Sequence, residues 1–205
     1  MNKAELERLA FPELLALFLS GQVETLWQND NDNENLDAFS VSIGNRLWNE
    51  MSSISDISPL FYSEFESCLF WATYIVWEEG VKGCELMDLM MMVSGSQFSS
   101  VRENVCRSLY ICWNMNYVDI LINFLRDDIA LVKDNALAIL AKIPDNSFSA
   151  LVEKVESGDE SHQELKYIIK YFTALRLGKS SDLERIAMSS DDEPLIYFHK
   201  AGNLR

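Results

Sequence analysis

Two stretches of the sequence, VRENVCRSL at residues 101–109 and VKDNALAIL at residues 132–140, align at a spacing of 31 residues. In both stretches a valine is followed by a basic residue, an acidic residue and an asparagine, and a leucine closes the stretch. The equal spacing predicts a structural unit that is repeated along the chain.

Apolar residues on either side of these stretches recur at i, i+3, i+4 and i+7, which is the pattern of one face of an α-helix. The sets are Leu86, Leu89, Met90 and Val93; Tyr117, Ile120, Leu121 and Phe124; Phe148, Leu151, Val152 and Val155; and, in part, Leu183 and Ile186. The predicted unit is a shorter helix, a turn and a longer helix.

Each turn carries residues that favour the start of a helix, because their side chains accept hydrogen bonds from free backbone N–H groups. The turns are SGS at 94–96, DD at 127–128, SGDES at 157–161 and DDEP at 191–194. The predicted helix pairs cover about 81–114, 115–145, 146–178 and 179–205. The 31-residue match fails before residue 80, and we expect residues 1–80 to form an irregular capping region of helices within the same domain.

The repeated pattern resembles the HEAT-like family of helical repeats, whose second helix commonly has an apolar residue, a basic residue and Asn-Ala ahead of a leucine. The segment from Val132 through Asn135 to Leu140 is the closer copy, and that beginning at Val101 is looser. The resemblance covers roughly residues 82–201 and implies an all-α fold, a short right-handed solenoid with an irregular N-terminal helical cap. A helical bundle without repeats remains the alternative.

The charge of the chain restricts its partners. The formal net charge is −15, and residues 1–100 carry 16 acidic and 4 basic side chains against 16 and 13 in residues 101–205. An acidic surface repels phosphates, so we expect neither nucleic acid nor an acidic membrane surface as a partner. A basic protein partner would be attracted.

The four cysteines, Cys68, Cys84, Cys106 and Cys112, lie in apolar stretches without a CxxC pair. We interpret them as small buried side chains in a reducing compartment. The longest apolar run, residues 68–77, is about half of what a bilayer crossing requires. These features predict a cytoplasmic protein.

In a solenoid, the faces of the second helices opposite the buried stripe form a continuous surface for a partner. The predicted partner-binding residues are Tyr74, Glu78, Glu103, Arg107, Tyr110, Asp134, Tyr167 and Lys170. A solvated charged face is the alternative for the charged residues, and a plain surface position for the tyrosines. Asn104 and Asn135 are expected to be structural, and Trp71, Trp77 and Trp113 to belong to the core.

Motifs for chemistry do not match. Asp30, Asp32 and Glu34 alternate as in a calcium loop, but position twelve is Val41 where a glutamate is required. His162 and His199 have no neighbours at zinc-ligand spacing, and nucleotide-binding and hydrolase motifs are missing. We therefore predict no catalytic residues, no metal and no cofactor.

The leading hypothesis is a non-enzymatic binding protein that neutralises a basic partner. In size, acidity and lack of chemical motifs the chain resembles bacterial immunity proteins, which block nuclease toxins of contact-dependent or polymorphic systems. The alternative is a HEAT-repeat adaptor or chaperone-like scaffold in a larger assembly. A third class, an enzyme on a helical-repeat frame such as a base-excision glycosylase or a pigment lyase, lacks the basic groove that DNA requires. The oligomeric state is left open.

Overall fold

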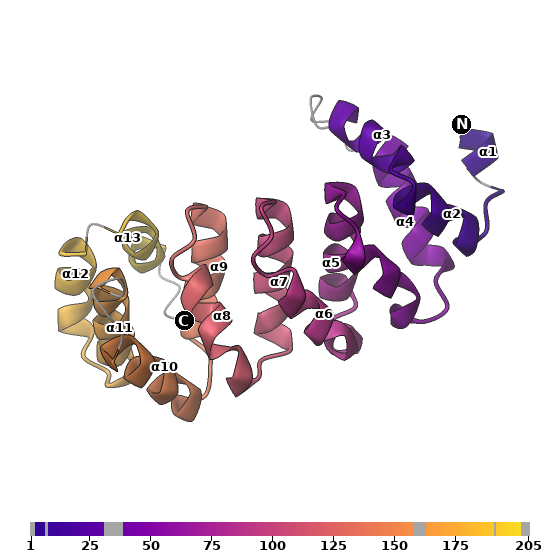
Figure 1. The fold of residues 1–205 in the computed structure, drawn as a ribbon. Coiled ribbons are helices and arrows are strands. Elements are labelled where there is room, and N and C mark those ends of the chain that lie inside the picture. The colour runs from indigo at the N-terminus through magenta and orange to yellow at the C-terminus, as the bar shows by residue number, and fades with distance from the viewer. Residues whose placement is uncertain (1–2, 7, 31–38, 158–162, 191, 202–205) are drawn as a thin grey trace. The chain divides into compact units, whose positions relative to one another are not determined.

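The computed structural model describes residues 3–6, 8–30, 39–157, 163–190 and 192–201. Within these ranges every regular element is helical, which confirms the all-α prediction. The chain divides into two compact units, residues 1–112 (unit 1) and 113–205 (unit 2). Figure 1 labels the helices and colours them from the N-terminus to the C-terminus.

Unit 1 contains seven α-helices and two 3₁₀ segments among its described residues. They are α1 (Lys3–Leu6), α2 (Phe11–Leu19), α3 (Gln22–Asp30), α4 (Phe39–Glu50), η1 (Ile54–Tyr62), α5 (Glu66–Glu78), η2 (Lys82–Leu86), α6 (Met87–Met92) and α7 (Ser99–Ile111).

The described part of unit 2 contains six α-helices and one 3₁₀ turn. They are η3 (Met115–Tyr117), α8 (Val118–Phe124), α9 (Ala130–Leu140), α10 (Asp145–Ser157), α11 (Gln163–Arg176), α12 (Ser180–Met188) and α13 (Glu193–Lys200).

The division between the units falls at 112/113, close to the predicted end of the first helix pair at 114 and not at residue 80. The reason is the packing of α5, which makes its most extensive contacts with α7. The last helix of the expected capping region and the first long repeat helix therefore share one hydrophobic core.

A hydrogen bond between buried side chains joins α5 to α7. Asn104 Nδ2 donates to Thr73 Oγ1 at 3.2 Å, and that hydroxyl donates in turn to the carbonyl oxygen of Leu69 at 2.8 Å. This confirms the structural role expected for Asn104. Asn135, 31 residues later, instead donates to the carbonyl oxygen of Leu131 in its own helix.

Helix α5 also contacts α4 through the side chain of Trp71, which lies against Gly44. A Cβ atom at Gly44 would lie only 1.9 Å from Cε2 of Trp71, so no larger residue fits without displacing the indole. Trp71 is 3% exposed, as expected of a core tryptophan. The indole of Trp71 thus fills the space that the missing side chain leaves.

Three of the long helices, α5, α7 and α9, begin in the same way. At each start a side-chain oxygen accepts a hydrogen bond from the backbone N–H two residues later, where the chain is extended before it turns into the helix. The pairs are Ser63 with Phe65 before α5, Ser96 with Phe98 before α7 and Asp127 with Ile129 before α9. The helix starts predicted at 94–96 and 127–128 are confirmed, whereas the start predicted at 157–161 lies mostly outside the described residues.

The core of unit 2 is closed by Arg176 at the end of α11. Its guanidinium donates to the carbonyl oxygens of Leu140 at 3.1 Å and Ile143 at 2.7 Å, and it lies 4.5 Å from the ring centre of Phe148. The Leu140 carbonyl belongs to the last turn of α9 and the Ile143 carbonyl lies just beyond it, where the helix itself supplies no further donor. Leu140 itself is fully buried, as the repeat pattern predicted.

The prediction for the cysteines was wrong for two of the four. Cys84 in η2 and Cys112 directly after α7 form a disulfide, with Cα atoms 5.4 Å apart. Contact between α7 and η2 brings the two cysteines together. They are 28 residues apart in the sequence, and no cysteine motif has that spacing, so the sequence did not predict the pair. Cys68 and Cys106 keep their thiols and are buried as predicted, and burial raises the pKa of the Cys68 thiol.

Candidate partner-binding surface

The strongest candidate site is a group of aromatic side chains on α4 and α5, which we call the aromatic surface: Trp48, Phe70, Tyr74 and Trp77. Helix α5 buries Cys68, Leu69, Ala72, Ile75 and Val76 in the core. Because α-helical positions i, i+4 and i+7 share a face, Phe70, Tyr74 and Trp77 lie together on the opposite side. All three are only partly buried, so the expectation of a core position does not hold for Trp77.

Tyr74 lies at the centre of the aromatic surface. Its ring is stacked on Phe70 at a centroid distance of 5.7 Å and meets Trp48 and Trp77 edge-on at 6.1 and 5.7 Å. Beneath them, buried Trp71 meets Tyr74 edge-on at 5.5 Å. Aromatic pairs in such arrangements hold one another in place, so a partner would meet a pre-ordered surface.

Charged side chains border the aromatic surface. The Arg107 guanidinium lies 4.6 Å from the ring centre of Trp77 and forms an ion pair with Glu103, one turn earlier on α7. On the other side, the indole N–H of Trp48 donates to Glu79 Oε1 at 2.7 Å. The border therefore contains three carboxylates, counting exposed Glu78, and one guanidinium, so its net charge is negative.

The pKa of the Tyr74 phenol reflects this environment. Burial raises it first, and the negative charge of Glu78 and a hydrogen bond to that carboxylate raise it further. Arg107 acts in the opposite direction but weakly. The phenol is therefore kept neutral and is positioned at the acidic border.

Unit 1 thus brings together five of the predicted contact residues: Tyr74, Glu78, Glu103, Arg107 and Tyr110. Tyr110 lies at the C-terminal end of α7 and is 45% exposed. It shares a helix face with Glu103 and Arg107, at the i, i+4, i+7 spacing. Trp48 was missed by the sequence analysis, because its helix lies in the region without repeats.

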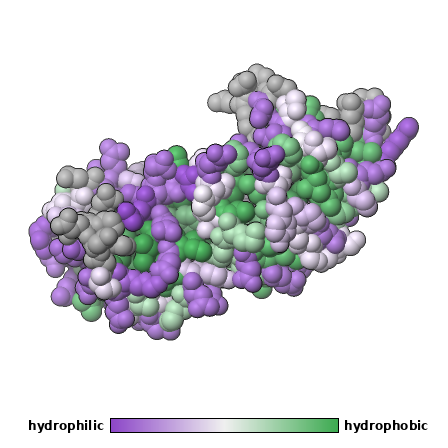
Figure 2. All heavy atoms as spheres, in the orientation of Figure 1, coloured by the Kyte–Doolittle hydropathy of each residue, from purple (hydrophilic) through white to green (hydrophobic). Residues whose placement is uncertain are grey.

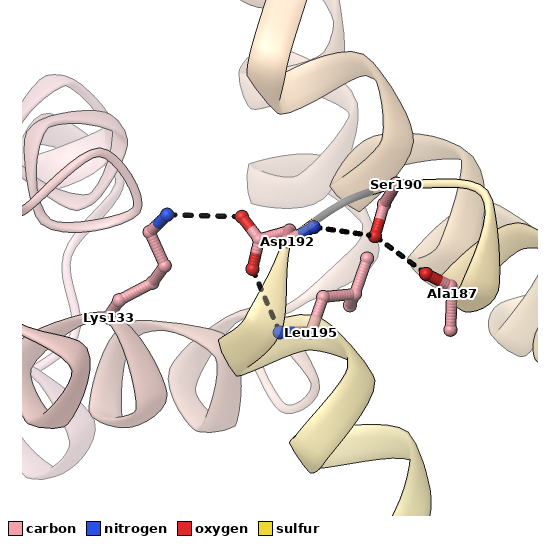
Figure 3. A network of polar contacts seen from close by, with 5 residues as sticks. All are labelled: Lys133, Ala187, Ser190, Asp192 and Leu195. Atoms are coloured by element: carbon pink, nitrogen blue, oxygen red, sulfur yellow. Dashed lines mark hydrogen bonds and ion pairs between the residues drawn. The ribbon is translucent and has the colours of Figure 1, made fainter.

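Asp134 in unit 2 does not lie on an open surface. Figure 3 shows the N-terminus of α13 beside α9: Lys133 Nζ lies 3.0 Å from Asp192 Oδ2, and Asp192 Oδ1 accepts the N–H of Leu195 at 2.9 Å. Burial raises the pKa of the Asp134 carboxyl, and the charge of Asp192 raises it further. Since α13 packs on α9, it covers part of the surface predicted for a partner.

The remaining predicted residues, Tyr167 and Lys170, are exposed on α11, with Lys170 Nζ 5.4 Å from the ring centre of Tyr167. They border a hollow in unit 2 that the sequence analysis did not anticipate. The predicted partner-binding residues therefore lie in three different settings: at the aromatic surface, at the contact between α9 and α13, and at the hollow.

The described residues do not assemble a metal site. No group of three or more His, Cys, Asp or Glu side chains among them is arranged to hold an ion. The rejected calcium loop falls mostly on residues 31–38, outside the described ranges. His199 Nδ1 lies 3.1 Å from the hydroxyl of Tyr171, and His162 is outside the described residues.

Comparisons with protein-family models, with curated proteins and with solved structures gave no match to this chain. Among the described helices, none is long and apolar enough to cross a bilayer. What the fold establishes is an all-helical protein of two compact units. On the face drawn in Figure 2, apolar residues reach the surface of unit 1 beside polar ones.

Proposed function

We propose that the chain is a non-enzymatic protein-binding module that binds and neutralises a basic, nuclease-type toxin, as an immunity protein does. The observation that carries this proposal is the aromatic surface with its acidic border. Aromatic side chains held in place near the centre of a patch are typical binding anchors. Residues 1–112, with 17 acidic and 6 basic side chains, would attract a positively charged protein.

The mechanism is occlusion. Lysines and arginines with which a nuclease binds phosphates pair with Glu78, Glu79 and Glu103, and one of them packs on an exposed ring. Cations over aromatic faces gain about 0.5–2 kcal/mol each, more when water is excluded. The nuclease then loses access to its substrate without any change in its catalytic residues.

The first experiment identifies the partner. The protein is immobilised and a lysate of its native host is passed over it, and each retained chain is then purified and assayed as a nuclease. We expect a basic chain whose nuclease activity is lost at one equivalent of this protein. A retained chain that is acidic, or a nuclease that stays active when saturated, would contradict the proposal.

The second experiment tests the surface. Glu78→Lys reverses a charge beside Tyr74, whereas Glu64→Lys makes the same change before the other end of α5, about 20 Å away along the helix. Both residues are exposed, so both variants should fold. Glu78→Lys should weaken inhibition at least about tenfold more than Glu64→Lys, and equal effects would place the partner elsewhere.

A salt series separates this function from scaffolding. Association steered by charge should slow at least about tenfold as ionic strength rises from low to high values. Salt-independent association with several weak partners would favour the adaptor.

For the fold, we propose that the helix pairs are HEAT-like repeats of a right-handed solenoid. The common start of α5, α7 and α9 supports a repeated unit. A crystal structure in which successive long helices do not stack in order would contradict it.

We also propose that the protein acts in the cytoplasm. Cytosolic thiols are kept reduced, so inside the cell the Cys84–Cys112 bond should be open, and both thiols should react with a thiol-alkylating reagent added to intact cells before lysis. Mass spectrometry that finds this pair bonded under those conditions would place the protein in an oxidising compartment.

A further inference from the structure

Unit 2 contains a hollow between α10, α11 and α12 that the proposed function does not use. Its volume is about 590 Å³, within the range of about 300–1,000 Å³ that small-molecule sites occupy. The described residues that line it all belong to unit 2. In Figure 1 these three helices follow one another at the C-terminal end of the chain.

The floor of the hollow is apolar. Ile169 and Ala174 of α11 are buried at its base, and Val152 of α10 and Ile186 of α12 are half-buried at its sides. Leu177, just after α11, is 63% exposed at its edge. An exposed leucine beside half-buried aliphatic side chains favours an apolar occupant over water alone.

The border of the hollow is cationic, which is unusual in so acidic a chain. Lys170, Lys179 and Arg185 line it, against the carboxylates of Glu156 and Asp182. Asp182 is already engaged by Arg185 at 3.3 Å. Neither lysine forms an ion pair with a carboxylate in the part of the chain that the structure describes.

Hydroxyl groups complete the border. Thr173 on α11, Ser189 at the end of α12 and Tyr167 on α11 also line it, and the ring centre of Tyr167 lies 5.4 Å from Lys170 Nζ. Ammonium and hydroxyl donors around an apolar floor match a ligand that combines one acidic group with a hydrocarbon body.

We propose that this hollow binds a small amphiphilic anion of the fatty-acid kind. The acidic head lies between Lys170 and Lys179, with Arg185 available to turn towards it. The hydrocarbon body lies on Ile169, Ile186 and Leu177. A hollow bounded by three helices favours such a small ligand over an extended acidic peptide, which would need a continuous groove. The proposal does not depend on the proposed function.

The test is a calorimetric titration of the full chain at low salt with four probes: decanoate, decanol, acetate and a short peptide of alternating glutamate and leucine. We expect saturable binding of decanoate. Decanol lacks the negative charge and acetate lacks the hydrocarbon chain, so both should bind at least about tenfold more weakly than decanoate. Tighter binding of the peptide than of decanoate would overturn the proposal in favour of an acidic protein segment.

Variants assign the binding to the hollow. Lys170→Ala and Lys179→Ala should each lower the affinity for decanoate about tenfold, whereas Lys200→Ala, an exposed lysine on α13, should leave it unchanged. No binding of decanoate, or equal binding by all three variants, would overturn the site. The Lys179→Ala variant should still inhibit the basic partner. Measuring this inhibition in parallel distinguishes a failure of the ligand site from a failure of the proposed function.

Discussion

The disulfide between Cys84 and Cys112 offers a prediction with a calculable magnitude. Replacing both cysteines by alanine opens a loop that spans 28 residues of unit 1. In the chain-entropy treatment, closing a loop of that length lowers the entropy of the unfolded chain by roughly 12 cal/mol/K, which corresponds to about 3.6 kcal/mol at 25 °C. Such a loss would be a large part of the stability of a unit of this size.

The assay is urea unfolding followed by tryptophan fluorescence, with and without a thiol reductant. Without reductant, the Cys84→Ala/Cys112→Ala variant should unfold at a lower urea concentration than the unmodified protein, by about 3.6 kcal/mol in free energy. With reductant, the unmodified protein should fall to the level of the variant, whose midpoint should not change. A reductant that shifts neither protein, or a variant within about 1 kcal/mol of the unmodified protein, would refute the reasoning.

Three further substitutions can be compared by thermal unfolding. Gly44→Ala should cost about 1–3 kcal/mol or more, since its Cβ would overlap the Trp71 indole; an unchanged melting temperature would contradict the packing of α4 on α5. Asp134→Asn should stabilise the fold at neutral pH, because the raised pKa of Asp134 means that folding disfavours its charged form, and the gain should vanish as the pH falls towards the ordinary aspartate value. Asp88→Asn, at an exposed position, serves as its control, and an equal gain there would count against burial as the cause. Leu140→Ala should cost about 2–5 kcal/mol, and a loss below 1 kcal/mol would remove Leu140 from the core.

The elements that the sequence predicted well are those with local signals. The long helices α7 and α9 were located from the two stretches that match at a spacing of 31 residues, and the turns before them from residues that accept backbone N–H groups. Asn104 was expected to be structural, and its bond to Thr73 confirms this. In each case the deciding residues lie within a few turns of one another.

The features that sequence reasoning missed depend on distant residues. No pattern links Cys84 to Cys112, because only the contact between η2 and α7 brings them together. Likewise α13 belongs to the least regular copy of the repeat, so its packing on α9 beside Asp134 had no signal. The hollow forms only where α10, α11 and α12 meet. The apolar pattern of a sequence predicts which face of each helix is buried, but not how three helices pack together.

The placement of the tryptophans makes the two proposed sites distinguishable by light. Trp48, Trp71 and Trp77 lie in unit 1 at or beneath the aromatic surface, whereas unit 2 contains Trp113, whose indole N–H donates to Ser147 Oγ at 3.1 Å. Among the described residues that line the hollow there is no tryptophan. A protein that docks on unit 1 should therefore shift the intrinsic emission of the chain, while an amphiphile that enters unit 2 should leave the spectrum almost unaltered, so one cuvette can report which event has taken place.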